Sequence, residues 1–390
     1  MMKETIRPDT PKKLFGMDPL QVKLGIYGFI LVLFVSMLSL KPYLPRALYH
    51  NFAEIYDYQF FPNRVVLAPH PGQPWTTTAV SMPDPDPKTA ALLADLKTTA
   101  LLVIENGNIV YEKYSEAGGV DVVSGSFSMA KSIVALLTGF ALQDHHLKSL
   151  DEPISTYLTE WEGRDEGKIT VRNLLSMTAG LNWNESYSNP FSITTEAYYG
   201  KDLHFTAFRQ HGIFAPGTRF DYQSGTTELL GLLVSRAVNR SLSQYASQKL
   251  WIPLGAEKDA LWSLDHEEGI EKAFCCFNAT ARDFARIGEF VRTDGRWQGK
   301  QLLNPDYIHQ MLTPNTLVDG SGMPANDYGY QWWILHTSKG DVPYARGILG
   351  QYIVVLPQKN RVLVRLGMKA GKLEGGHPVE LLALVDWMLR

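Results

Sequence analysis

The sequence has little cysteine and no excess of charge of either sign. Its 390 residues include 37 Lys and Arg against 40 Asp and Glu, a balance that does not favour nucleic acid as a partner. The two cysteines, Cys275 and Cys276, are neighbours, and neighbouring cysteines rarely satisfy disulfide geometry. We therefore expect two free, buried thiols with no metal role. The length suits one large or two ordinary globular domains.

Several catalytic motifs are also missing. No G-x-S-x-G is present, which argues against an alpha/beta-hydrolase. The pair His145-His146 and the stretch around His266 lack the H-E-x-x-H spacing of a zinc site. No glycine-rich phosphate loop followed by a lysine occurs either. We therefore predict an activity that needs no metal and no organic cofactor.

One long uncharged run lies close to the N-terminus. Residues 24–40, "LGIYGFILVLFVSMLSL", carry no charge over 17 residues, at the short end of what spans a bilayer. The following "KPYLP" shows no small-x-small cleavage site, so we expect an uncleaved anchor, in preference to a buried core helix or a cleaved signal peptide. Basic residues precede the run, which predicts a cytoplasmic tail at 1–23 and export of the remainder.

The remainder separates into a connector and one domain. Residues 41–87 hold seven prolines between Pro62 and Pro87, which predicts an extended connector or a surface arm and places the compact domain at 88–390. Residues 98–114 form two strands around Asn106-Gly107, a strong hairpin signal. A second strand pair flanks "QKN", and "PVELLALVDWML" closes the chain as a helix. One sheet built from both ends with a helical insertion is an α+β fold.

The stretch "GSFSMAKS" contains the first candidate for chemistry. Ser128 is the only serine with a lysine three residues further on, and Lys131 would share one face of a helix with it. A helix that begins near Ser128 leaves its N–H unpaired and favours a developing oxyanion. Burial would neutralise Lys131 and make it a base for the serine. The alternative from these residues alone is a helix cap followed by a surface lysine.

The stretch "DYQSG" contains the second candidate. It precedes an apolar helical pattern, which places Tyr222 and Ser224 in a loop at a helix start. Residues two apart in an extended loop point the same way, so the phenol and the hydroxyl would face one site. The alternative is a half-buried tyrosine beside a capping serine.

Five motifs occur in an order that resembles one enzyme family. They are "SFSMAKS", "ITVRNLLSMTAGL", "FAPGTRFDYQSGTTELLG", "NATARDFARIG" and "ARGILGQYIVVLP". Together they resemble the serine beta-lactamase-like, or penicillin-recognising, hydrolases, in the branch of class C relatives, esterases and 6-aminohexanoate-dimer hydrolases. The resemblance covers roughly 90–390. It implies a two-lobed fold, with an antiparallel sheet flanked by helices, a mostly helical lobe and the site in the cleft between them.

The resemblance also implies roles for individual residues. Ser128 matches the nucleophile, Lys131 the general base and Tyr222 the tyrosine that relays a proton to the leaving group. Ser224 stands where many relatives have asparagine. The backbone N–H of Ile348 would complete the oxyanion hole with the N–H of Ser128.

The expected substrate-binding residues are Tyr187, Ser224, Arg346 and Gly347. The Lys-Thr-Gly of beta-lactamases is replaced here by Ala345 to Gly347, so strong beta-lactamase activity is not expected. Arg346 would offer a carboxylate contact in place of the missing lysine, or would simply be solvated. Tyr187 matches a tyrosine that contacts the substrate amide from a mobile loop, or would be an ordinary exposed loop aromatic.

We predict a serine hydrolase that cleaves a small-molecule amide or ester through an acyl-enzyme. By the family resemblance it would be anchored in a bacterial inner membrane, single-pass, with its catalytic domain on the periplasmic side. One alternative is a penicillin-binding D,D-peptidase or beta-lactamase. Another is a non-catalytic membrane protein that binds cell-wall fragments or a partner. The sequence does not predict the oligomeric state.

Overall fold

The computed structural model describes residues 19–79 and 81–390. The chain divides into two compact units, the first ending at Asn51 and the second running from Phe52 to Arg390. In the first unit the described elements are α1 (Pro19–Leu40) and α2 (Leu44–His50). Most of the predicted cytoplasmic tail, residues 1–18, lies outside the described residues.

The predicted membrane anchor falls on α1. Among the described residues, no helix combines the length and the hydropathy that crossing a bilayer requires. The anchor over 24–40 is therefore not confirmed and stays a prediction.

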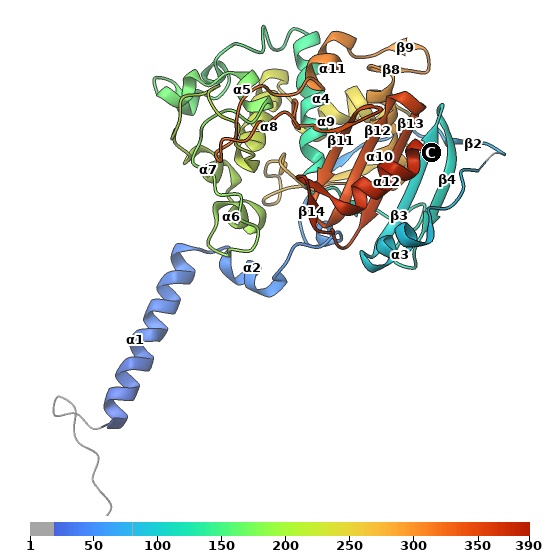
Figure 1. Cartoon of the computed structure of the whole chain (residues 1–390). Helices are drawn as coiled ribbons and strands as arrows, with labels where there is room; N and C mark the ends of the chain where they lie inside the picture. The colour runs from blue at the N-terminus through green and yellow to red at the C-terminus, as the bar shows by residue number, and fades with distance from the viewer. Residues whose placement is uncertain (1–18, 80) are drawn as a thin grey trace, which may run out of the picture. The chain divides into compact units, whose positions relative to one another are not determined.

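The second unit is built around a seven-stranded sheet (Figure 1). Its strand order is β10-β11-β12-β13-β3-β4-β2, and every pairing except that of β2 with β4 is antiparallel. The central pair, β13 with β3, joins the two ends of the domain sequence, as predicted. The strands are β2 (Thr76–Thr77), β3 (Thr98–Glu105), β4 (Asn108–Tyr114), β10 (Trp333–Thr337), β11 (Gly340–Gly347), β12 (Gln351–Leu356) and β13 (Arg361–Gly367).

Helices cover both faces of this sheet (Figure 1). Strand β3 alternates between them, since Leu102 and Ile104 pack with helices α4 (Met129–Gln143) and α10 (Ala281–Arg292). Leu101 and Val103 pack on the other face with α3 (Pro87–Asp95) and α12 (Val379–Leu389). Because both faces are covered, β3 is apolar without interruption from Ala100 to Ile104.

The two predicted hairpins and the closing helix are confirmed. Asn106 and Gly107 have φ of 50° and 77°, the left-handed pair that a two-residue hairpin turn requires. Strands β12 and β13 are joined through "PQKN", where Asn360 is also left-handed.

The other elements form the helical lobe, a second sheet and short hairpins. The second sheet has the order β1-β6-β7-β5, in which β1 comes from the predicted connector. The predicted boundaries at 41–87 and 88–390 remain predictions. The elements are β1 (Asn63–Val66), β5 (Ser124–Gly125), β6 (Ala260–Ser263), β7 (Phe277–Ala279), β8 (Arg296–Trp297), β9 (Lys300–Gln301), β14 (Leu373–Glu374), β15 (His377–Pro378), α5 (Val171–Leu175), α6 (Ile193–Tyr199), α7 (Leu203–Phe208), α8 (Ser224–Val238), α9 (Leu242–Ala246) and α11 (Pro305–Met311).

The expectation of two free thiols is wrong. Cys275 and Cys276 form a disulfide with each other. Cys276 has a φ of 68°, a left-handed conformation that an L-residue rarely adopts, and this turn of the backbone accompanies the bond. The predicted burial of both side chains is confirmed, because only 4% and 5% of the two residues is exposed.

Candidate active site

Ser128 lies at the start of the buried helix α4. The helix is apolar on all sides except at Lys131 and a few small hydroxyl residues, so it occupies the interior between the sheet and the helical lobe. Phe127, just before Ser128, has a φ of 45°, and this left-handed residue turns the chain into the helix. Among the described residues the Ser128 N–H makes no backbone hydrogen bond. It is therefore available, at the positive end of α4, to a negatively charged oxygen.

Lys131 is buried directly beside Ser128. Its Nζ lies 2.9 Å from Ser128 Oγ, 3.0 Å from Ser224 Oγ and 2.9 Å from the carbonyl oxygen of Phe274. Only 1% of the residue is exposed. Burial lowers the pKa of Lys131 from 10.5 to about 8, against Glu185 and Glu228, which raise it. A lysine with this pKa is partly neutral near physiological pH and can act as a base.

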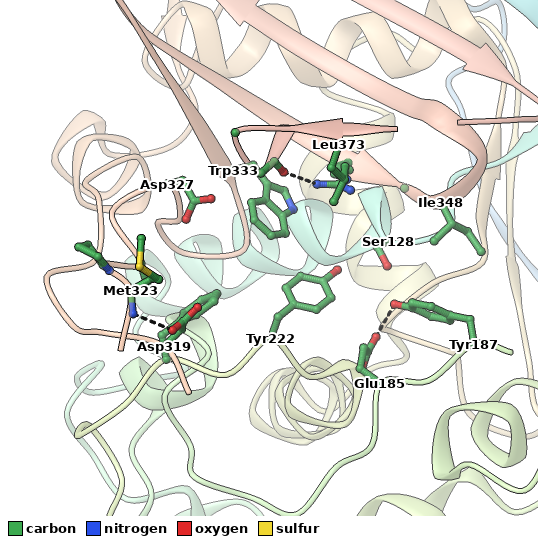
Figure 2. A pocket seen from close by; sticks show the side chains of 17 residues that line it. Ser128, Glu185, Tyr187, Tyr222, Asp319, Met323, Asp327, Trp333, Ile348 and Leu373 are labelled. Atoms are coloured by element: carbon green, nitrogen blue, oxygen red, sulfur yellow. Dashed lines mark hydrogen bonds between the residues drawn. The ribbon is translucent and has the colours of Figure 1, made fainter. Parts of the chain in front are cut away.

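Tyr222 and Ser224 reach the same place from the start of α8. Ser224 is the first residue of that helix and Tyr222 lies in the loop before it, as predicted. Figure 2 shows the Tyr222 hydroxyl directed toward Ser128, and the Lys131 Nζ lies 5.1 Å from the centre of the Tyr222 ring. Burial and the charge of Glu185 raise the pKa of Tyr222, so this phenol carries its proton at neutral pH.

Glu185 is a member of this cluster that the sequence analysis did not identify. Its Oε1 accepts a hydrogen bond from Ser224 Oγ at 2.5 Å, and its Oε2 accepts one from the backbone N–H of Ser224 at 2.7 Å. The Tyr187 hydroxyl also donates to Oε1 (Figure 2). The only signal in the sequence is the position of Glu185 two residues before Tyr187, in the segment between "ITVRNLLSMTAGL" and "FAPGTRFDYQSGTTELLG". That signal is too common to select a residue.

The end of β11 closes the site on the opposite side. A Cβ placed on Gly347 would lie 2.2 Å from the carbonyl oxygen of Ser126, so only glycine allows the strand to approach the turn that carries Ser128. Ile348 follows at the start of a 3-10 turn and lines the same cavity as Ser128. The residue expected to complete the oxyanion hole is thus brought to the side of Ser128 by a close backbone approach.

Gly347→Ala should therefore lower both stability and activity. Its φ of −116° suits alanine, so the expected cost, about 1–3 kcal/mol, comes from steric overlap, mainly with the Ser126 carbonyl and to a smaller extent with Gln351 and Phe127. We would measure the free energy of unfolding and the rate of Ser128 acylation. Gly212→Ala is the matched control, because a Cβ there meets nothing within 4 Å. Equal stability of the two variants would contradict the close approach.

One cavity gathers most of the predicted site residues. It is lined by Ser128, Tyr187, Tyr222 and Ile348, which Figure 2 labels, and by Arg346 and Gly347. Lys131 and Ser224 are buried, and Lys131 contacts both Ser128 and Ser224. The sequence analysis missed other lining residues, which come from segments far apart in the chain. They include Phe220, Asp319, Met323, Asp327, Trp333 and Leu373.

Arg346 contributes a positive charge to this cavity. Its guanidinium stacks over Trp333 at 5.3 Å from the ring centre and reaches the carbonyl oxygen of Gly376 at 3.4 Å. Among the described residues no carboxylate lies within ion-pair distance of it. Its guanidinium is therefore available to an anionic group of a ligand.

Comparison with known proteins gives consistent matches. Residues 87–381 match the family model described as Beta-lactamase. A 6-aminohexanoate-dimer hydrolase of Paenarthrobacter ureafaciens is 27% identical over 294 residues, which cover 70% of this chain and 73% of that protein.

Solved structures share the fold. A Bacillus anthracis protein provisionally assigned as a 6-aminohexanoate-dimer hydrolase superposes with a TM-score of 0.75 at 23% identity, over 86% of this chain and 91% of its own. A family VIII carboxylesterase superposes with a TM-score of 0.61 at 15% identity, over 80% of this chain and 99% of its own. Since the family model spans most of the sequence, the chain belongs to the beta-lactamase family and is a serine hydrolase.

Proposed function

We propose that the protein hydrolyses a small-molecule amide or ester through an acyl-enzyme on Ser128, with Lys131 as the general base and Tyr222 as the proton relay. The observation that carries this proposal is the contact between a fully buried lysine and a serine hydroxyl at 2.9 Å. A buried ammonium is costly, and an active-site base is the simplest reason to retain one.

In the proposed acylation step, the neutral amine of Lys131 removes the hydroxyl proton of Ser128 while the oxygen attacks the substrate carbonyl. The N–H groups of Ser128 and Ile348 would hold the resulting oxyanion. Tyr222, protonated and directed at Ser128, would pass a proton to the leaving amine or alcohol as that bond breaks, and would be reprotonated from Lys131. Water then hydrolyses the ester bond to Ser128 and restores the free enzyme.

Intact-mass spectrometry after exposure to a fluorophosphonate tests the activated serine. We expect one adduct per chain on the wild-type protein. A folded sample without an adduct would contradict the proposal and favour a non-catalytic binding protein. A parallel sample treated with penicillin addresses the alternative of a D,D-peptidase or beta-lactamase. Because the site lacks Lys-Thr-Gly, we expect no efficient acylation by penicillin, and a penicillin adduct or rapid penicillin hydrolysis would favour that alternative.

The substrate class follows from the cavity wall and from the relatives. Aromatic and aliphatic side chains from Tyr187, Trp333 and Leu373 line the cavity, together with Arg346 and the carboxyl groups of Asp319 and Asp327. This favours a substrate with an apolar chain and polar or charged ends, one of them an anionic group for Arg346. We propose linear amides, with the 6-aminohexanoate dimer as the first compound to test, and esters of similar shape.

Tyr187→Phe should slow the hydrolysis of amides more than the hydrolysis of esters. The Tyr187 hydroxyl is held by Glu185 at the cavity wall, although 46% of the residue is exposed, so it is placed to contact an amide group of the substrate. We expect a loss of about tenfold in kcat/KM for the amide, the size of one lost hydrogen bond, and a smaller loss for the matched ester. Equal losses for both substrates would remove this role.

We also propose that the chain is anchored by residues 24–40 in the inner membrane, single-pass, with the catalytic domain on the periplasmic side. The absence of charge in that segment supports this, as does the Cys275–Cys276 disulfide, since disulfides persist in oxidising compartments. The full chain should stay in the membrane fraction after alkaline carbonate washing and be digested by protease added to spheroplasts. Release by carbonate, or protection from the protease, would contradict this.

A further inference from the structure

We propose that Glu185 is a positioning residue, which acts through Ser224 to direct the lone pair of Lys131 at the Ser128 hydroxyl. This inference rests on the proposed roles of Ser128 and Lys131. It adds a carboxylate to the site and explains why a hydroxyl is placed between that carboxylate and the base.

Glu185 determines the direction in which Ser224 donates. Its carboxylate receives three donors, namely the Ser224 hydroxyl at 2.5 Å, the Ser224 backbone N–H at 2.7 Å and the Tyr187 hydroxyl. A carboxylate offers only accepting oxygens, and two of these three donors belong to Ser224, the first residue of helix α8. The single hydroxyl proton of Ser224 is therefore donated to Glu185. Ser224 consequently faces Lys131 with lone pairs only.

The direction of the Ser224 hydrogen bond determines the direction of the Lys131 amine. A neutral amine has two N–H groups and one lone pair, and Lys131 Nζ has three oxygen neighbours at 2.9–3.0 Å. The Phe274 carbonyl can only accept, and Ser224 is left with lone pairs only, so these two oxygens take the two N–H groups. The lone pair is then left for the third neighbour, the hydroxyl of Ser128. Proton removal needs this orientation.

The charge of Glu185 acts in the same direction. When Lys131 accepts the serine proton it becomes an ammonium, and a nearby carboxylate stabilises that product. The ionisable groups around Lys131 are Glu185, Glu228 and Tyr222, with the Tyr222 ring 5.1 Å away. Glu228 is 1% exposed and accepts the N–H of Ala273, and burial raises its pKa well above the usual value. Tyr222 is kept protonated by burial as well. Glu185, which accepts from Ser224 and raises the pKa of Lys131, is therefore the carboxylate that we expect to stabilise the ammonium.

Glu185→Gln should reverse the polarity of these hydrogen bonds. The amide has one accepting oxygen, which the backbone N–H of Ser224 requires, so its NH₂ group would face the Ser224 hydroxyl. The Ser224 proton would then be free to point at the Lys131 lone pair and block it. We expect the plateau of kcat/KM to fall about tenfold or more. The acid limb should also move to lower pH, because removing the carboxylate lowers the pKa of Lys131.

The experiment is the pH profile of kcat/KM from pH 6 to 10 with a p-nitrophenyl ester. It compares the full-length wild-type protein with Glu185→Gln, Ser224→Ala and the double variant. Because both residues act through one hydrogen bond, the double variant should lose no more than the worse single variant. Glu160→Gln is the control: it removes a carboxylate paired at 2.6 Å with Arg236 of the same helix α8, outside the site, and should leave the profile unchanged.

Each result decides the inference. A Glu185→Gln profile equal to the wild type overturns it, and so does a lower plateau with an unmoved acid limb, which would leave Glu185 only a structural support. If Glu185→Gln does not fold, Ser224→Ala decides, and an unchanged plateau overturns the inference. Failure of the proposed function is distinguishable, because the wild-type protein would then neither react with a fluorophosphonate nor hydrolyse the ester.

Discussion

Ser128→Ala should abolish turnover while the fold stays intact. Of the two hydroxyls beside Lys131, those of Ser128 and Ser224, only that of Ser128 lines the cavity. No other serine in the sequence has a lysine at the same spacing. We expect kcat/KM to fall by at least about 10³-fold for amides and esters alike, as for the loss of a nucleophile in other serine hydrolases. Hydrolysis of the test ester and the mass of the fluorophosphonate-treated protein are the two measurements.

The stability of the Ser128→Ala variant is the control that separates a loss of catalysis from a loss of folding. Ser128 makes one hydrogen bond to Lys131, and the loss of one such bond costs about 1 kcal/mol. Thermal unfolding should therefore change by only a few degrees. A Ser128→Ala protein that keeps its activity or its adduct would place the nucleophile elsewhere and contradict the whole assignment.

Lys131→Met should lower activity nearly as much as Ser128→Ala, because it removes the general base and not the nucleophile. Methionine keeps the apolar stem and fills the buried space, but it has no amine to accept the Ser128 proton. Loss of a general base typically costs about 10²–10⁴-fold in rate. In the wild-type protein kcat/KM should rise with pH as Lys131 loses its proton near pH 8, and the variant should lack this limb. If kcat/KM still rises with pH in Lys131→Met, this rise comes from the titration of another group.

The same substitution should change how stability depends on pH. Burial lowers the pKa of Lys131 from 10.5 to about 8 in the folded protein. Between these two values the unfolded chain binds the proton and the folded protein does not, so the free energy of unfolding rises with pH. The full contribution is about 3 kcal/mol. Urea unfolding at pH 7 and pH 10 should show this rise in the wild-type protein in excess of Lys131→Met, and an equal pH dependence in both would contradict the burial of a titrating lysine.

Local sequence patterns were enough to predict the main secondary-structure elements and the pairing of Ser128 with Lys131 in the candidate site. The spacing of Ser128 and Lys131, the Asn106-Gly107 turn and the two strands beside that turn each follow a short-range rule, and the structure contains all of them. The strand pairs near both ends of the domain predicted the shared sheet, and the family resemblance supplied the expected role of Tyr222.

Contacts between segments that are far apart in the sequence are established only by the tertiary structure. Glu185 joins the site because a loop of the helical lobe places it on the first turn of α8, and no spacing in the sequence encodes that contact. The Phe274 carbonyl reaches Lys131 from a segment 143 residues away. The disulfide that follows it depends on the left-handed backbone of Cys276, which the general rarity of bonds between neighbouring cysteines argued against. The sequence by itself was enough to predict which residues would carry the chemistry, whereas folding decided how they are oriented, because hydrogen-bond direction and burial depend on neighbours that only the folded chain provides.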